Sequence, residues 1–190
     1  MKIIAVAGMP GAGKTESLKY FQSKNIPTIS MGDVIINEMR KRNLEVNHKS
    51  IGEFATKIRK DTGMDAAAKL CVPYILEKNN DLIFIDGIRS YEEIEFFQKT
   101  FTNDFILIAI HTPQPLRYER IMVRNQERDT KSWEDFIARD HRELDWGLGK
   151  TISLAHFEID NTSSLENLHQ QLESTLEKIN SVHNQKTTNV

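Results

Sequence analysis

The sequence is poor in cysteine, in long apolar runs and in excess charge of either sign. Cys71 is the single cysteine of 190 residues, so it has no partner for an intramolecular disulfide or for a zinc cluster. No apolar run approaches the roughly 18 residues that span a bilayer. The 25 basic and 27 acidic residues leave a net charge of −2, unlike a general nucleic-acid-binding protein. We therefore expect a cytoplasmic protein with neither a nucleic-acid nor a membrane partner.

Five short apolar runs indicate the strands of an α/β fold. They are uninterrupted rather than alternating, which is typical of strands covered on both faces, and they span residues 3–7, 26–31, 82–85, 105–110 and 157–159. Because helical patterns separate them, we expect right-handed crossovers and a doubly wound parallel sheet of five strands. Residues 1–190 then form a single domain that binds ligands at the carboxyl ends of its strands.

Serine followed three residues later by an acidic residue predicts the start of a helix. Four such pairs occur, namely Ser50/Glu53, Ser90/Glu93, Ser132/Asp135 and Ser163/Glu166. The last precedes a row of leucines at three- and four-residue steps, so we expect a C-terminal helix followed by a frayed tail at 184–190. Two intervals between strands are too long for a simple crossover. They predict helical insertions at about 32–80 and 124–150.

A Walker A pattern, G-x-x-x-x-G-K-T, occupies residues 8–15 between the first predicted strand and a helix. Small residues let successive backbone N–H groups curl around a β-phosphate. Lys14 adds charge on the β- and γ-oxygens, and Thr15 offers a hydroxyl to Mg²⁺. A plain glycine-rich turn with a solvated lysine is the alternative, but the strand–loop–helix context favours the phosphate site. The residues expected at the donor triphosphate are Gly8, Pro10, Gly11, Ala12, Gly13, Lys14, Thr15 and Glu16.

Asp86 is the candidate for a second Mg²⁺ ligand. It follows four apolar residues of the third predicted strand, which places it at a carboxyl end beside the loop, where it could hold the ion directly or through water. The alternative is that Asp86 only begins the turn Asp-Gly-Ile-Arg. Together with the Walker A pattern it implies Mg²⁺ and ATP, or another nucleoside triphosphate, as ligands.

Arginines recur at helical spacing in the second half of the chain. Arg117, Arg120, Arg124 and Arg128 are separated by three, four and four residues, and Arg139 and Arg142 follow in a predicted helix at 132–143. Phosphoryl transfer needs charge neutralisation and exclusion of water, and a mobile arginine-bearing lid supplies both. A solvated face paired with nearby acidic residues is the alternative.

Two further residues are candidates for an acceptor site. Arg89 lies three residues after Asp86, where it would reach across the strand ends to an anionic acceptor or else form a surface salt bridge. Asp33 ends the second predicted strand in the sequence SMGD. It is either a helix N-cap or an acceptor-site carboxylate, and the two roles are compatible.

The motifs GMPGAGKT, SMGDVI, LIFIDGIRS, LIAIHTPQPLRYERIMVR, RDTKSWEDFIARDHREL and HFEIDNTSSLENL follow one another as in nucleoside-monophosphate-kinase-like P-loop proteins. To about residue 180 the chain resembles most an archaeal family of adenylate-kinase-related proteins. Its IDN-S-L element is also similar to that of dephospho-coenzyme A kinase. The resemblance implies a three-layer P-loop NTPase fold in which 32–80 binds the acceptor and 124–150 forms the lid.

The resemblance also implies roles for individual residues. It places residues 8–15 on the donor, Asp86 near Mg²⁺, Asp33 and Arg89 in the acceptor site, Arg120 and Arg124 on the transferring phosphates, and Arg128, Arg139 and Arg142 in the lid. One position departs from the family. An arginine usually follows the aspartate of SMGD by three residues, whereas this chain has Ile36, so Arg40 is the candidate replacement from the next helical turn.

Three functions fit these residues, and the first is favoured. It is a kinase that transfers the γ-phosphoryl group of Mg-ATP to a nucleotide-type acceptor, in particular a nucleoside monophosphate, which needs no general base. The second is a dephospho-coenzyme A kinase-like enzyme that phosphorylates a ribose hydroxyl, with Asp33 as base. The third is a nucleotide-binding regulatory protein without an acceptor. No motif indicates an oligomeric state.

Overall fold

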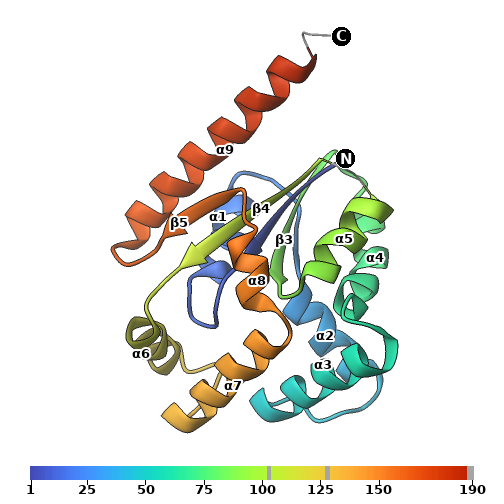
Figure 1. Cartoon of the computed structure of the whole chain (residues 1–190), viewed down its shortest axis with the longest axis vertical. Helices are drawn as coiled ribbons and strands as arrows, with labels where there is room; N and C mark the ends of the chain where they lie inside the picture. The colour runs from blue at the N-terminus through green and yellow to red at the C-terminus, as the bar shows by residue number, and fades with distance from the viewer. Residues whose placement is uncertain (102–103, 127–128, 188–190) are drawn as a thin grey trace.

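Five parallel strands form the central sheet of the computed structural model (Figure 1). The structure describes residues 1–101, 104–126 and 129–187, with side chains as far as Ser181. The spatial order of the strands is β2-β3-β1-β4-β5, which confirms the predicted parallel sheet. The strands are β1 (Lys2–Ala7), β2 (Thr28–Ser30), β3 (Leu82–Ile88), β4 (Phe105–His111) and β5 (Phe157–Asp160).

Helices connect the strands and cover both faces of the sheet. They are α1 (Lys14–Ser23), α2 (Met31–Lys41), α3 (His48–Thr62), α4 (Ala66–Lys78), α5 (Tyr91–Thr100), α6 (Gln114–Arg124), α7 (Trp133–Asp145), α8 (Leu148–Ser153) and α9 (Leu165–Thr187). Both long intervals between strands are thus helical, as expected. The C-terminal helix continues to Thr187, further than the frayed tail predicted from residue 184, and residues 188–190 lie outside the described part.

Alternate residues of β1 belong to two separate hydrophobic cores. Ile3 and Ala5 pack in the core that includes α2, α4 and α5, together with the buried Cys71. Ile4 and Val6 point to the other face, where α1 and α9 cover the sheet. Because both faces are buried, alternation of apolar and polar residues would place polar groups in a core. This explains why the strands read as uninterrupted apolar runs.

Two of the four predicted helix starts are confirmed in detail. Ser90 caps α5, and its side chain and that of Glu93 exchange hydrogen bonds with each other's backbone N–H groups. Ser132 caps α7 by accepting a hydrogen bond from the N–H of Asp135 at 3.1 Å. Each contact satisfies an N–H group that has no partner within its helix.

The other two starts are wrong by one to three residues. Asn47, not Ser50, caps α3, and Ser50 is the third helical residue, whose hydroxyl accepts a hydrogen bond from the Asn47 N–H. At α9 the Oγ of Ser164, not Ser163, accepts from the N–H of Asn167 at 3.2 Å. Asparagine and serine both cap helices well, so the pattern alone does not choose between neighbouring cap residues.

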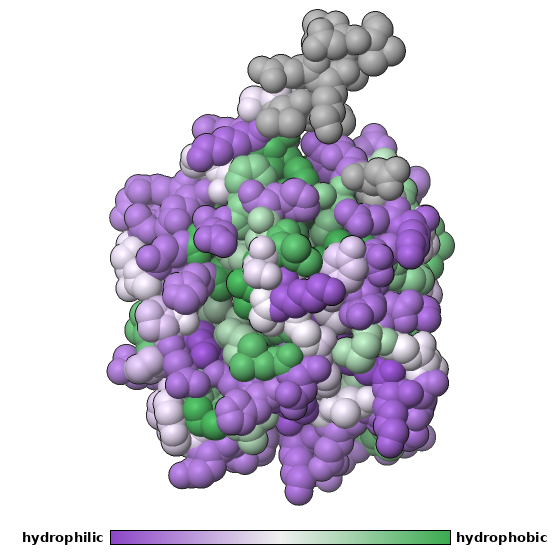
Figure 2. Space-filling view, viewed as in Figure 1, coloured by the Kyte–Doolittle hydropathy of each residue, from purple (hydrophilic) through white to green (hydrophobic). Residues whose placement is uncertain are grey.

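The helical insertions lie beyond the carboxyl ends of the strands. In Figure 1 the helices α2 and α3 lie to the right of the loop that follows β1, α6 lies to its left, and α7 lies below it. In the same view the surface is mainly hydrophilic, with hydrophobic side chains in patches between the polar ones (Figure 2). Among the described residues, no helix is both long and apolar enough to cross a membrane.

Candidate phosphotransfer site

A cavity of about 640 Å³ opens at the carboxyl ends of the central strands. Its walls come from the loop after β1, the end of β3, helices α2, α3, α6 and α7, and the segment after β5. The charged side chains on the wall comprise seven basic and four acidic ones: Lys14, Arg59, Arg89, Arg120, Arg124, Arg139 and Arg142 against Glu16, Asp86, Glu119 and Glu143. The cavity is therefore suited to an anionic ligand.

The loop after β1 leaves no room for side chains at two of its glycines. Gly11 and Gly13 both have positive φ, 82° and 113°. A Cβ at Gly11 would lie 2.6 Å from the carbonyl oxygen of Arg117, and one at Gly13 would lie 2.3 Å from Nδ2 of Asn161. Asn161 in turn donates a hydrogen bond from Nδ2 to the Ala12 carbonyl at 2.9 Å. Asn161, in the segment after β5, therefore supports the loop after β1 by packing and by a hydrogen bond. The sequence analysis did not predict this role.

Lys14 is folded back across this loop. Its Nζ donates hydrogen bonds to the carbonyl oxygens of Gly8 at 2.6 Å and Met9 at 3.1 Å. Burial lowers the pKa of Lys14 from 10.5 to about 8, although the carboxylates of Asp86 and Glu143 oppose the shift. A bound triphosphate would favour the protonated amine, so this side chain is poised to neutralise a phosphate.

Thr15 and Asp86 line the same cavity and form a suitable donor set for Mg²⁺. Hydroxyl and carboxylate oxygens are hard ligands of the type that Mg²⁺ prefers, alongside phosphate and water oxygens. No cluster of three or more potential metal-binding acidic, histidine or cysteine side chains occurs in the described residues, so phosphate oxygens would have to complete the site. Asp86 lies within β3 rather than after it, because β3 extends to Ile88.

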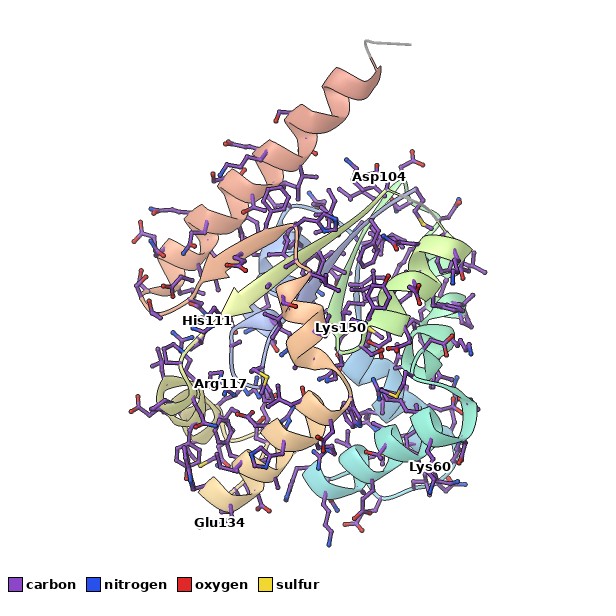
Figure 3. The ribbon with its side chains drawn as sticks, viewed as in Figure 1. Lys60, Asp104, His111, Arg117, Glu134 and Lys150 are labelled. Atoms are coloured by element: carbon purple, nitrogen blue, oxygen red, sulfur yellow. The ribbon has the colours of Figure 1, made fainter. Side chains whose placement is uncertain are left out.

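Arg117 does not reach the cavity, contrary to the expectation of one continuous phosphate-facing stripe. It is 4% exposed, and its guanidinium forms a bidentate pair with Asp140 of α7 at 2.9 and 2.6 Å. It also donates to the carbonyl oxygens of Pro10 at 2.9 Å and Thr112 at 3.2 Å. Figure 3 shows Arg117 between α6 and the loop after β1. Its position joins the phosphate-binding loop to α7.

Arg120 and Arg124 of α6 do line the cavity. Arg120 donates from Nη1 to Thr112 Oγ1 at 3.5 Å, a long contact that holds the side chain loosely. Arg124 pairs with the buried Asp129, with 2.9 Å between Nε and Oδ2. Arg128 lies outside the described residues.

Glu143 connects two of the predicted arginines and was not predicted as a site residue. Its Oε2 accepts from Arg89 Nε at 3.0 Å, and its Oε1 accepts from Arg139 Nε at 3.1 Å. Burial raises the pKa of Glu143, but the two guanidinium groups outweigh burial and lower it to about 2. Its spacing of four residues from Arg139 was the one signal available in the sequence. The carboxylate thus orients Arg89, from the turn between β3 and α5, and Arg139 of α7.

Asp33 and Arg40 do not lie where sequence reasoning placed them. Both are exposed residues of α2, and neither lines the cavity. Ser30 is the N-cap of α2, and its Oγ accepts from the N–H of Asp33 at 3.2 Å, so Asp33 is the third helical residue rather than the cap. The face of α2 that does reach the cavity carries Ile35 and Ile36, and Arg40 is a full turn further along the helix.

Comparison with known proteins assigns the family. A family model described as an AAA domain matches residues 7–136. A UPF0200 protein of Methanosarcina acetivorans is 42% identical over 176 residues, which cover 93% of this chain and 94% of the relative. The chain belongs to the UPF0200 family. Another UPF0200 protein, of Thermococcus onnurineus, is 38% identical over 95% of this chain and 100% of its own length. The predicted similarity to an archaeal P-loop family is confirmed.

Solved structures show that the UPF0200 chain has the fold of P-loop kinases. TT1252 from Thermus thermophilus aligns with a TM-score of 0.65 at 16% identity, over 93% of this chain and 97% of the other. Shikimate kinase from Acinetobacter baumannii gives 0.60 at 18% identity, over 95% and 94%. Dephospho-CoA kinase from Campylobacter jejuni gives 0.56 at 21% identity, over 96% and 100%. The similarity confirms the predicted three-layer α/β architecture.

Proposed function

We propose that this protein is a Mg²⁺-dependent phosphotransferase. It moves the γ-phosphoryl group of ATP, or of another nucleoside triphosphate, to a small nucleotide-type acceptor, with a nucleoside monophosphate favoured. The observation that supports the proposal is that Lys14, Thr15 and Asp86 line one cavity together with arginines from α6, from α7 and from the turn after β3. In this proposal α2–α4 bind the acceptor, and residues 124–150 form a lid over the donor.

Catalysis in such a site consists mainly of positioning and charge neutralisation. The backbone N–H groups of the loop hold the β-phosphate, and Lys14 contacts the β- and γ-oxygens. Arg120 and Arg124 approach from α6, and Arg139 approaches from α7, where they neutralise charge that develops on the transferring group. When bound by Thr15 and Asp86, Mg²⁺ would add its charge to the same phosphate oxygens.

The wall of the cavity favours an acceptor that is already anionic. A hydroxyl acceptor benefits from a carboxylate within hydrogen-bond reach that removes its proton. Asp33, the candidate base, lies off the wall, while the pKa of Glu143, at about 2, makes it a poor base. A monophosphate acceptor needs no such group, and the excess of arginines suits its charge.

An acceptor panel tests the proposal directly. ADP release from Mg-ATP is measured with each nucleoside monophosphate, with dephospho-coenzyme A and without acceptor. Release that depends on a monophosphate supports the proposal, whereas activity with dephospho-coenzyme A alone replaces it with the hydroxyl-kinase alternative. Tight ATP binding with no acceptor-dependent release from a wider panel would contradict phosphotransfer and point to a regulatory role.

Asp33→Asn separates the two kinds of acceptor further. If the acceptor is a monophosphate, turnover should change by less than about twofold, because no general base is required. A hydroxyl kinase that uses Asp33 as its base would lose about 10²-fold or more while still binding ATP. The comparison of kcat with the dissociation constant of Mg-ATP decides between these outcomes.

A further inference from the structure

At the end of the cavity that we propose binds the acceptor, helix α2 contributes only uncharged residues to the wall, namely Met31, Gly32, Ile35 and Ile36. At this end α2 and α3 present an apolar wall formed by Met31, Ile35, Ile36, Ile51 and Ala55. Such a wall accommodates the uncharged ring of a ligand but gives no counter-charge to its phosphate. A cation for that phosphate therefore has to come from another element.

Arg142 of α7 reaches this wall through a slot at Gly52 of α3. A Cβ at Gly52 would lie only 2.3 Å from Cζ, 2.6 Å from Nη2 and 2.7 Å from Nε of Arg142. The guanidinium thus rests directly on the backbone of α3, which glycine alone permits. Because α3 packs against α2, the slot lets the positive charge of Arg142, a residue of α7, lie beside the apolar wall that α2 and α3 form.

Arg142 differs from the neighbouring arginines because no carboxylate of the described residues pairs with its guanidinium. Arg59 is paired with Glu93 at 2.7 Å, while Arg89 and Arg139 share Glu143. Arg59 Nε, Arg139 Nη1 and Arg142 Nε are all buried without a hydrogen-bond partner in the described part of the chain. Among the side chains that the structure describes, however, Arg142 is the one of these three that forms no ion pair. Its acidic neighbours are Glu143, which the other two arginines already engage, and Glu53, which is exposed. A buried donor without a partner favours a ligand that supplies an acceptor atom.

We propose that Arg142, held against Gly52 of α3, binds the anionic group of the acceptor at the end of the cavity where α2 presents Ile36. The acceptor class is then a phosphomonoester whose uncharged ring packs on the isoleucines of α2 and α3. This assignment rests on the proposed function, which it deepens by naming the group that selects the acceptor. Gly52 acts as a positioning residue, since it provides the slot.

The first test removes the charge of Arg142. In Arg142→Gln, we expect the dissociation constant of AMP, titrated calorimetrically without ATP, to rise at least ~10-fold, because a charge-assisted hydrogen bond is lost. The KM for the acceptor should rise with it. Affinity for Mg-ATP should stay within about twofold, since the donor loop keeps its contacts. The same titration uses GMP, CMP, UMP and inorganic phosphate as further probes.

Three companion variants make the test specific. Gly52→Ala keeps every charge but displaces the guanidinium, so it should weaken AMP binding by roughly 3- to 10-fold. Arg42→Gln removes an exposed arginine that pairs with Glu38 outside the cavity, and it should change nothing. Ile36→Arg combined with Arg142→Gln should recover part of the AMP affinity, which a merely structural role of Arg142 does not predict.

The outcomes separate this inference from the proposed function. Unchanged AMP and phosphate binding in Arg142→Gln overturns the inference, and so does a wild-type protein that binds none of the five probes. Loss of AMP affinity in Arg40→Gln instead would also overturn it. If wild-type protein shows no acceptor-dependent ADP release but Arg142→Gln loses AMP affinity, phosphotransfer fails while the anion site stands. If Arg142→Gln keeps both its turnover and a normal KM for the acceptor, phosphotransfer stands while the anion site fails.

Discussion

The proposed donor end and the proposed acceptor end of the cavity are built in different ways. The proposed donor end is one continuous segment, residues 8–15, in which Gly11 and Gly13 have no room for a Cβ. In the proposed function its backbone N–H groups do most of the binding. The proposed acceptor end assembles side chains from the turn after β3, from α2 and α3, and from α7, which are far apart in the chain. A backbone site is specified locally, whereas a side-chain site depends on how distant helices pack. The two ends should therefore respond differently to substitution.

The ion pair of Arg117 and Asp140 connects the loop after β1 with α7. Breaking this pair should have the largest effect on stability. Asp140→Ala leaves the guanidinium of Arg117 buried without its carboxylate, because both residues are less than 5% exposed. We expect a loss of about 3–5 kcal/mol in the free energy of unfolding, measured by urea denaturation. Asp61→Ala, which removes an exposed pair with Lys57, should cost less than about 1 kcal/mol. Equal losses of unfolding free energy in the two variants would contradict a structural role of the ion pair of Arg117 and Asp140.

Lys14→Ala should disable the donor end without unfolding the protein. Removing the ammonium group from the transferring phosphate should lower kcat/KM for Mg-ATP by at least ~10²-fold in the ADP-release assay. Binding of AMP without ATP should remain nearly unchanged, since the acceptor end does not use this side chain. Near-normal turnover in Lys14→Ala would disprove the assignment of the donor site.

Gly13→Ala tests whether the donor end depends on backbone space. The alanine would have to adopt a φ near 113° and displace Asn161, which holds the Ala12 carbonyl. We expect Mg-ATP affinity to fall by about 5- to 30-fold, from strain of about 1–2 kcal/mol. The matched control is Gly149→Ala in α8, where the new Cβ would lie at an ordinary 3.6 Å from Leu144. An equal loss of ATP affinity in Gly149→Ala would show that the effect is not specific to the loop after β1.

The pKa of Lys14 predicts a smaller, pH-dependent effect at the donor end. Because this pKa is lowered to about 8, half of the amine is neutral at pH 8 and only a tenth stays charged at pH 9. Mg-ATP affinity should therefore fall about twofold at pH 8 and about tenfold at pH 9 relative to pH 7, as titration calorimetry would measure. Lys14→Arg keeps its charge over this range and should flatten the profile. A flat wild-type profile would show that the amine stays protonated.

Sequence reasoning performed best where one element carries the whole signal. The strands, the Walker A loop and two helix caps were predicted from short local patterns, and they occur as predicted within a few residues. The incorrect predictions concern side chains on helices, where the rotation of the helix about its axis decides which side chains face the cavity. Asp33 and Arg40 were placed in the acceptor site, but α2 turns Ile35 and Ile36 toward the cavity instead. Helical spacing gives relative positions on a face but does not say which face is inward.

The arginines illustrate the same limit. Even spacing grouped Arg117 with Arg120 and Arg124, yet Arg117 is buried in an ion pair with Asp140 while the other two reach the cavity. Small rotations along α6 separate a structural arginine from those able to contact phosphate. Glu143 was inconspicuous in the sequence, because one of its partners, Arg89, lies directly after β3. Arg142 was predicted as a lid residue, but its contact with Gly52 of α3 was not predicted.

By itself the sequence determined the layered α/β fold, the donor loop and the excess of cations around it. Buried strands and glycine-dependent backbone turns are properties of contiguous residues, so they can be read without knowing the rest of the fold. Only the tertiary structure decided which arginines are structural, which carboxylate orients Arg89 and Arg139, and that Arg142 packs on Gly52 of α3. These choices depend on which side chains α7 brings against α3 and β3, and such contacts arise only when distant segments pack together.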